Sequence, residues 1–324
     1  MSASSVSLWW KPGGRWEVKG RNQLAHTFSI VARDPETGEL GVAVQSHWFS
    51  VGSVVAWAEA GVGAVATQSL VEVSYGPLGL ALMRAGKSAE EALTALLAAD
   101  EGRDLRQVAM VDAQGRVAVH TGARCIAEAG HEVGPGFSVQ ANMMINDTVW
   151  SAMAHAYEST EGDLAERLLA ALEAGQAAGG DIRGQQSAAI LIVKGTSTGR
   201  PWADTVMDLR VEDHPEPIRE LRRLVQIHRA YQHMNRGDER LGEGKGEEAL
   251  EEYRAAAALA PHIEELPFWQ AVTLADLGRL EEALPIFGRV FAVNPAWADL
   301  VRRLPASGLL RDDPEMMRRI LETL

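Results

Sequence analysis

Residues 27–33 read TFSIVAR, and residues 40–46 read LGVAVQS. Along the first segment, alternate side chains point to opposite sides of an extended chain, as expected for a β-strand. Between the two segments, DPETG at residues 34–38 holds a proline and a glycine, which favour a turn. The two segments therefore predict a β-hairpin.

The first residue of this hairpin carries possible chemistry. If the chain were cut between His26 and Thr27, the strand would begin with a free threonine, which has a hydroxyl nucleophile and an α-amine base on one residue. An α-amine has an ordinary pKa of about 7.7–8.0, so it accepts a proton near neutral pH. The alternative is that Thr27 is only a strand residue, since β-branched side chains are common in strands.

The bulk properties narrow the class of protein. A chain of 324 residues is long enough for two domains. The net charge of −13 argues against a nucleic-acid backbone or an anionic membrane surface as a partner. No run of about 20 apolar residues is present to span a membrane. The single cysteine, Cys125, allows no intramolecular disulfide, which fits a cytoplasmic location.

Residues 1–26 lack the continuous apolar core of a secretory signal. They are either a pro-segment that is removed to free Thr27 or an extension that stays in place. The sequence leaves both alternatives open.

Beyond the hairpin, hydrophobic periodicity predicts alternating groups of strands and helices. A capping box at Ser88 and Glu91 marks the start of one of these helices. An order of strands, two helices, strands, two helices and strands suits sheets that are covered by helix pairs. Strands are expected at residues 54–57, 61–68, 108–111, 116–120, 136–142, 188–193 and 205–211, and helices at 75–86, from 88, at 147–157, 164–178 and 218–234.

The C-terminal third has an internal period. Small, aromatic, small and proline residues recur 34 positions apart: Ala249, Tyr253, Ala256 and Pro261, then Ala283, Phe287, Val290 and Pro295. This spacing resembles tetratricopeptide repeats (TPR), in which helical hairpins stack through small residues. We therefore expect a helical domain at residues 218–324, after an N-terminal segment at 1–26 and a domain at 27–217.

Four segments carry a resemblance to a known bacterial family. They are TFSIVA at 27–32, GVGAVATQ at 61–68, GDIRGQQS at 180–187 and DLRVEDHP at 208–215. The chain resembles domain of unknown function 1028, which is grouped with the Ntn (N-terminal nucleophile) hydrolases. The resemblance implies an α+β fold, the four-layer αββα sandwich of the Ntn hydrolases, over about residues 27–230.

The resemblance also implies site residues. Thr27 would be the nucleophile, and Asp181 would be the supporting aspartate that precedes a late strand. The proteasome-type members have a carboxylate after the second strand and a lysine on the third. Here Gln45 and Ser46 stand at the first place, and residues 54–57 contain no lysine.

Further polar residues are candidates for binding. Asn142, Gln186 and Ser187 are able to donate hydrogen bonds to an oxyanion, although a turn role for Asn142 is equally open. Arg183 either binds a substrate carboxylate or pairs with Asp181. The expected catalytic residues are Thr27, Asp181 and Asn142. The expected substrate-binding residues are Ser46, Arg183, Gln186 and Ser187.

Two functions are open at this stage. The first is an Ntn-type amidohydrolase that cleaves a carbon–nitrogen bond of a small molecule or peptide, with no metal or organic cofactor. It requires residue 27 to become a chain end in a cleft between two sheets. The second is a catalytically silent scaffold whose TPR-like segment recruits a protein partner. A homo-oligomer is expected in either case.

Overall fold

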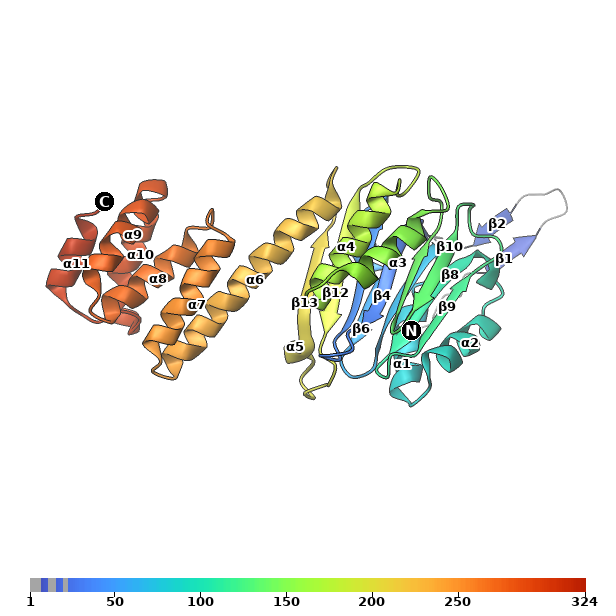
Figure 1. Ribbon diagram of the computed structural model, residues 1–324, viewed down its shortest axis with the longest axis horizontal. Coiled ribbons are helices and arrows are strands. Elements are labelled where there is room, and N and C mark those ends of the chain that lie inside the picture. The colour runs from blue at the N-terminus through green and yellow to red at the C-terminus, as the bar shows by residue number, and fades with distance from the viewer. Residues whose placement is uncertain (1–6, 11–15, 20–22) are drawn as a thin grey trace. The chain divides into compact units, whose positions relative to one another are not determined.

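The computed structural model describes residues 7–10, 16–19 and 23–324, with side chains from His26 onward. The chain forms two compact units, one that ends at Arg222 and one that spans Arg223–Leu324. Most of the expected pro-segment or extension at residues 1–26 lies outside the described residues. From Thr27 on, the chain is a mixed α+β unit followed by a helical one (Figure 1).

The strands of the first unit all pair antiparallel. Strands β1 and β2 pair with each other, and the remaining strands form a six-stranded and a five-stranded sheet. The strands are β1 Ser7–Trp10, β2 Trp16–Lys19, β3 Gln23–Ala25, β4 Thr27–Arg33, β5 Leu40–Ser46, β6 Ala56–Glu59, β7 Gly63–Val71, β8 Arg106–Asp112, β9 Val117–Thr121, β10 Gly130–Gly134, β11 Phe137–Ala141, β12 Ser187–Val193 and β13 Thr205–Val211.

The predicted hairpin lies at the centre of the six-stranded sheet, whose order is β10-β11-β4-β5-β12-β13. In its register, Thr27 lies opposite Ser46 and Arg33 opposite Leu40. Both strands are paired on each side, so almost every residue of β4 and β5 is buried. The beginning of β4 is therefore deep inside the unit.

The five-stranded sheet has an unusual edge along β7. Strand β6 pairs with β7 at Gly63–Ala66, and β3 pairs with β7 at Ser69–Val71, while β8 pairs along the other side of β7. Strands β3 and β6 therefore lie end to end on one side of β7. Thr67 and Gln68 of β7 lie between these two partners.

The two sheets pack face to face, and alternation along the strands shows which side chains form the contact. On β7, Ala64 and Ala66 join a core that includes Val31, Val42 and residues of β12. The intervening Val65 packs against the helices that cover the outer face of this sheet. Period-2 patterning thus buries both faces of β7.

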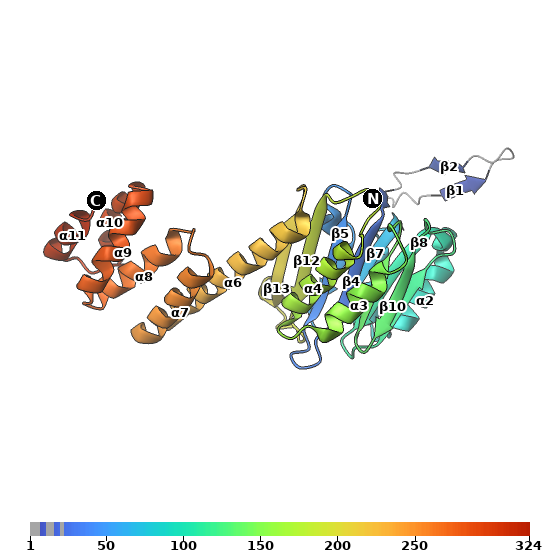
Figure 2. The same cartoon turned by 45° about the horizontal axis from the view of Figure 1, so that its top comes forward.

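A pair of helices covers the outer face of each sheet (Figure 2). Helices α1 Tyr75–Arg84 and α2 Ala89–Ala99 pack on the five-stranded sheet, and α3 Val149–Ser159 and α4 Leu164–Ala177 pack on the six-stranded sheet. The capping box of Ser88 and Glu91 is present at the start of α2. A short helix, α5 Pro201–Asp204, precedes β13.

Several elements differ from the sequence expectation. The strand expected at 54–57 begins two residues later, at Ala56, because residues 51–53 form a 3-10 turn. Before β11, the edge strand β10 was not predicted, since its residues are polar and half-exposed or exposed. The helix expected at 218–234 extends from Pro217 to Gly242 as α6, and Gly237 lies within it.

Helices of the second unit stack as hairpins. After α6 Pro217–Gly242, which begins in the first unit, come α7 Gly246–Leu259, α8 Glu265–Asp276, α9 Leu280–Val293, α10 Ala296–Arg303 and α11 Pro314–Leu321. The recurring residues of α7 and α9 are all buried, Tyr253 at 1% and Phe287 at 0% exposure. At Gly237, an added Cβ would lie 2.7 Å from the Tyr253 ring, so a small residue is required for these helices to approach.

Candidate functional site

The chain changes sheets immediately before Thr27. Strand β3 belongs to the five-stranded sheet and β4 to the six-stranded sheet, and His26 is the one residue between them. His26 is 1% exposed and Thr27 is fully buried. The peptide bond that joins them therefore crosses the space between the two sheets.

Two side chains donate hydrogen bonds to the carbonyl oxygen of this peptide bond. The Ser46 hydroxyl lies 2.6 Å from the His26 oxygen, and Nη2 of Arg183 lies 2.8 Å from the same atom. Ser46 is in place because it faces Thr27 across the β4–β5 ladder. Donors that converge on one carbonyl oxygen stabilise negative charge that develops there.

Arg183 is oriented by a buried carboxylate. Its Nε donates to Oδ1 of Asp181 at 3.0 Å, and its Nη2 donates to Oδ2 at 2.7 Å. The Asp181 side chain is fully buried, and it also accepts the backbone N–H groups of Arg183 and His47. A two-pronged pair of this kind fixes the guanidinium plane, so Asp181 sets the direction of the Arg183 donors.

The loop that carries this pair needs glycine. Gly179, Gly180 and Gly184 have φ values of +128°, +64° and +104°, which other residues rarely adopt. The loop is also tied to the segment after β11, since Ile145 N donates to Gly180 O and Ile182 N donates to Met143 O. Met143 itself has a φ of +60°, so one non-glycine residue in an uncommon backbone conformation lies beside the site.

Asn142 contacts the residues on both sides of the peptide bond. Its backbone N–H and its Nδ2 donate to the carbonyl of Thr27 at 3.1 and 3.4 Å, and its Oδ1 lies 2.8 Å from Nδ1 of His26. Asn142 thus holds the oxygen of Thr27, whereas Ser46 and Arg183 hold the oxygen of His26. Of the residues expected to bind or donate, Ser46, Arg183 and Asn142 are brought together here, and Asn142 acts on a different carbonyl from the other two.

A network of buried amides fixes the orientation of Asn142. Nε2 of Gln107 donates to the carbonyls of Ala141 and Gly130, so its Oε1 is the atom that faces Asn142 Nδ2 at 2.9 Å. A carbonyl can only accept. Asn142 therefore turns Oδ1 toward His26, and His26 must carry its proton on Nδ1.

The surroundings of the His26 ring favour its neutral form. Burial lowers its pKa below the ordinary value, the Asn142 hydrogen bond acts in the opposite direction, and the positive charge of Arg183 lowers the pKa further. Its other nitrogen, Nε2, is buried and has no hydrogen-bond partner. Such an unpaired atom costs about 1–3 kcal/mol, so the ring is bound less well than a fully paired one.

The other two expected residues have side chains engaged elsewhere. Gln186 donates through Nε2 to Asp213 at 3.0 Å. The Ser187 hydroxyl donates to the carbonyl of Trp48 and accepts the N–H of Val51 at 3.1 Å. The Ser187 contacts hold the turn that follows β5, and neither side chain is directed at the His26–Thr27 bond.

Residues that sequence reasoning missed include His26, Gln68 and Gln107. Nε2 of Gln68 donates to the carbonyl of Thr27 at 3.2 Å and to Oε1 of Gln107 at 2.7 Å, and its Oε1 accepts from Ser29. A signal was present, because a fully buried glutamine in an apolar strand needs hydrogen-bond partners. The partners themselves are distant in sequence.

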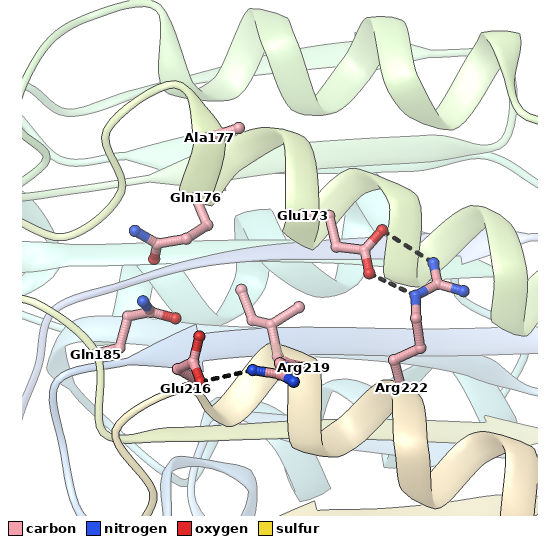
Figure 3. Close-up of a pocket in the computed structure, with 8 residues that line it drawn as sticks. Glu173, Gln176, Ala177, Gln185, Glu216, Arg219 and Arg222 are labelled. Carbon is pink, nitrogen blue, oxygen red and sulfur yellow. Dashed lines mark hydrogen bonds and ion pairs between the residues drawn. The ribbon is translucent and has the colours of Figure 1, made fainter.

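A hollow in the first unit lies apart from this constellation (Figure 3). Its cavity volume is about 330 Å³, and Glu173, Gln176, Gln185, Glu216, Arg219 and Arg222 are among its lining residues. Arg222 pairs with Glu166 and Glu173, and Arg219 pairs with Glu216. Its charges thus already pair with one another, and none of the expected site residues lines it.

No group of three or more His, Cys, Asp or Glu side chains in the described part of the chain is arranged to hold a metal ion. Among the described helices, none combines the length and apolarity needed to cross a membrane.

Comparison with known proteins places the first unit in a family. The family model described as "Family of unknown function (DUF1028)" matches residues 27–221. The chain belongs to this family. The DUF1028 match begins at Thr27, the first residue of β4.

A solved DUF1028 structure is similar to this chain. The crystal structure of protein SPO2555 from Silicibacter pomeroyi is 33% identical, with a TM-score of 0.57, and the match covers 62% of this chain and 85% of that one. Among curated proteins, no match was found.

Proposed function

We propose that this DUF1028 protein is a self-processing amidohydrolase of the N-terminal nucleophile type. The observation that carries the proposal is the pair of donors, Ser46 and Arg183, on the carbonyl oxygen of the peptide bond before Thr27. The start of the DUF1028 match at Thr27 also supports the proposal.

The proposed self-processing step is a balanced exchange of bonds. The Thr27 hydroxyl oxygen attacks the His26 carbonyl carbon, the C–N bond breaks, and the hydroxyl proton passes to the Thr27 nitrogen. The product is an ester between His26 and the Thr27 side chain. Water then hydrolyses this ester to a His26 carboxylate and an N-terminal Thr27 with a free amine and a free hydroxyl.

In the processed protein, the same groups would cleave a substrate amide. The Thr27 amine takes the hydroxyl proton as the hydroxyl attacks the substrate carbonyl, and the leaving amine receives a proton. The acyl ester on Thr27 is then hydrolysed by water. Ser46 and Arg183 would stabilise the oxyanion in both steps, because they already bind the equivalent oxygen of His26.

The positive charge near Thr27 belongs to Arg183, whereas in proteasome-type relatives it belongs to a lysine. Arg183 bonds the oxygen of the same peptide group to which the Thr27 nitrogen belongs. A nearby cation disfavours protonation of an amine and so keeps it available as a base. In this proposal, Arg183 takes the place of the absent lysine, and Asp181 moderates its effect.

The architecture supports the Ntn assignment in the same way. Two face-to-face sheets with a helix pair outside each match the four layers of an αββα sandwich. The nucleophile of such a fold is the first residue of a strand and faces the space between the two sheets. Thr27 is the first residue of β4. Because Thr27 is fully buried in the uncut chain, substrate access requires that the upstream residues leave.

The helical unit supports a TPR-like interaction role as a second proposal, either beside catalysis or in a catalytically silent scaffold. The observation in its favour is that residues 34 positions apart in α7 and α9, such as Ala249 and Ala283, are buried at equivalent points of successive helices. Stacked helical hairpins of this kind present extended binding surfaces.

Intact-protein mass and the N-terminal residue of the purified chain test the proposed hydrolase. We expect loss of residues 1–26 and a threonine N-terminus, and we expect Thr27→Ala to abolish the cleavage. A mechanism-based electrophile should then label Thr27. A full-length chain that hydrolyses amides would contradict the mechanism, and an uncut, inactive chain would favour the silent scaffold.

A further inference from the structure

The residues just upstream of the proposed cleavage point are bound as an extended strand. Strand β3 pairs with β7 in the register Gln23 with Val71, Leu24 with Leu70 and Ala25 with Ser69. This pairing uses backbone groups, so it does not depend on which side chains occupy β3. When β3 departs, the edge of β7 at Ser69–Val71 loses its strand partner.

This edge is bounded at one end. Strand β6 pairs with the earlier part of β7, from Gly63 to Ala66, on the same side. An incoming strand therefore has a defined place, beyond Gln68 and alongside Ser69–Val71. Ser69 has a φ of +73°, an uncommon backbone conformation that gives this part of the edge a fixed, irregular shape.

The last residue before the cleavage point is bound through its side chain as well. The His26 ring donates from Nδ1 to Asn142 Oδ1, whose orientation the Gln107 amide fixes. The carbonyl of His26 meets Ser46 and Arg183. Backbone pairing, side-chain donor and carbonyl position together define a binding mode for the acyl side of an amide.

We propose that residues 23–26 occupy the place where the protein binds the acyl side of its substrate, and that the substrate is an extended peptide. Its backbone adds a strand to the free edge of β7 at Ser69–Val71, and its last residue before the cleaved bond carries an N–H donor for Asn142. This inference rests on the proposed function. It names the substrate class, which is a peptide or peptide amide rather than a small amide.

The chemistry of this substrate needs only water as co-reactant. The carbonyl carbon of the last residue bonds to the Thr27 hydroxyl oxygen, and its C–N bond breaks to release an amine. Water hydrolyses the resulting ester and releases the peptide as a carboxylic acid. That acid has the same end group as the cleaved upstream segment, so this product should compete with the substrate for the place occupied by residues 23–26.

The test uses the full chain after self-processing and a set of 4-nitroanilides. The reference substrate is acetyl-QLAH-4-nitroanilide, which copies residues 23–26. The comparison substrates are acetyl-H-4-nitroanilide, which lacks the strand, and acetyl-QLAF-4-nitroanilide, whose phenylalanine lacks the N–H donor. We expect kcat/KM to fall at least tenfold for each of them.

Backbone pairing of the substrate with β7 can be tested separately, by N-methylation of the substrate. In an antiparallel ladder, alternate residues direct their N–H groups to the partner strand. N-methylation along QLAH should therefore be costly at alternate positions and tolerated between them. Uniform tolerance would overturn strand addition.

A pair of variants tests the side-chain contact. Asn142→Ala should remove the preference for QLAH over QLAF, whereas Ser53→Ala, whose exposed hydroxyl bonds the nearby Ser50 carbonyl, should keep it. If Asn142→Ala does not fold, the QLAH-to-QLAF ratio of the unmodified chain remains the measurement, and a ratio near one overturns the inference.

The outcomes separate the two proposals. A chain that frees Thr27 and cleaves acetyl-H-4-nitroanilide as fast as acetyl-QLAH-4-nitroanilide keeps the proposed function and overturns the extended-peptide inference. The extended-peptide inference is also overturned if the chain frees Thr27 and cleaves no peptide of the set. A chain that never frees Thr27 removes the proposed function and this inference with it.

Discussion

Arg183 donates a hydrogen bond to the carbonyl oxygen of His26 at 2.8 Å, although 157 residues separate them in the chain. The Ser46 hydroxyl meets the same oxygen from the neighbouring strand. These two contacts select one peptide bond of the first unit as the candidate for attack, and they lead to the following predictions.

Ser46→Ala should slow cleavage of the His26–Thr27 bond. The substitution removes one donor to the developing oxyanion, and the loss of one such donor costs about 10²- to 10³-fold in rate. A time course of intact-protein mass measures the effect. Ser53→Ala is the control, because the Ser53 hydroxyl bonds only the nearby Ser50 carbonyl and is exposed. Equal cleavage by both variants would contradict a role for the Ser46 hydroxyl.

Arg183→Lys should slow cleavage less than Arg183→Ala. Lysine keeps the positive charge but cannot form the two-pronged contact that Arg183 makes with Asp181. The same mass time course compares the three chains. A purely structural role predicts that folding, followed by circular dichroism, changes in parallel with the rate. An undisturbed fold with a graded loss of rate supports a role at the carbonyl.

Asp181→Asn should act through Arg183. The buried carboxylate becomes neutral, so the guanidinium loses its counter-charge and its fixed direction. We expect slower cleavage and a free energy of unfolding that falls by about 1–3 kcal/mol, because Arg183 is partly solvated. Urea unfolding in the uncut Thr27→Ala background separates the stability effect from the rate. A variant with normal stability and normal cleavage would exclude Asp181 as the positioning group.

The uncut chain should lose stability below about pH 6.5. Burial lowers the pKa of His26 from its ordinary value of 6.5. The unfolded chain therefore binds more protons than the folded chain below that pH, and the free energy of unfolding falls as the pH drops toward the lowered pKa. Urea unfolding of Thr27→Ala between pH 5 and 8 measures this.

The matched control for this pH effect is the double variant with His26→Gln in the Thr27→Ala background. Burial and the neighbouring His120 also lower the pKa of His131, so some pH dependence should remain in both chains. The difference between the two profiles isolates His26. Superimposable profiles would show that the His26 ring is not held neutral by the fold.

Gly237→Ala should loosen the contact between α6 and α7. An added Cβ would lie 2.7 Å from the Tyr253 ring, and overpacking of this kind costs about 1–3 kcal/mol. Hydrogen exchange of α7 amides reports the change locally. Gly242→Ala, which meets nothing within 4 Å, is the control and should be neutral or stabilising by up to about 1 kcal/mol. Equal exchange rates in the two variants would contradict the close packing.

Local patterns in the sequence were sufficient for most of the elements. The alternation at residues 27–33, the turn at 34–38 and the capping box at Ser88 are short-range features, and the structure has β4, β5 and α2 there. The pattern failed at β10, whose exposed edge residues carry no apolar periodicity. It also ended α6 too early, at about Met234, although the helix continues to Gly242.

By itself, the sequence determined the hairpin, the order of strands and helices, and the residue types able to carry chemistry. Only the tertiary structure decided which carbonyl Ser46 and Arg183 hold, that Asn142 holds a different one, and that His26 is the point where the chain changes sheets. The physical reason is that element formation depends on neighbours a few residues apart. The candidate site instead depends on hydrogen bonds between strands and loops that are brought together only when the two sheets pack.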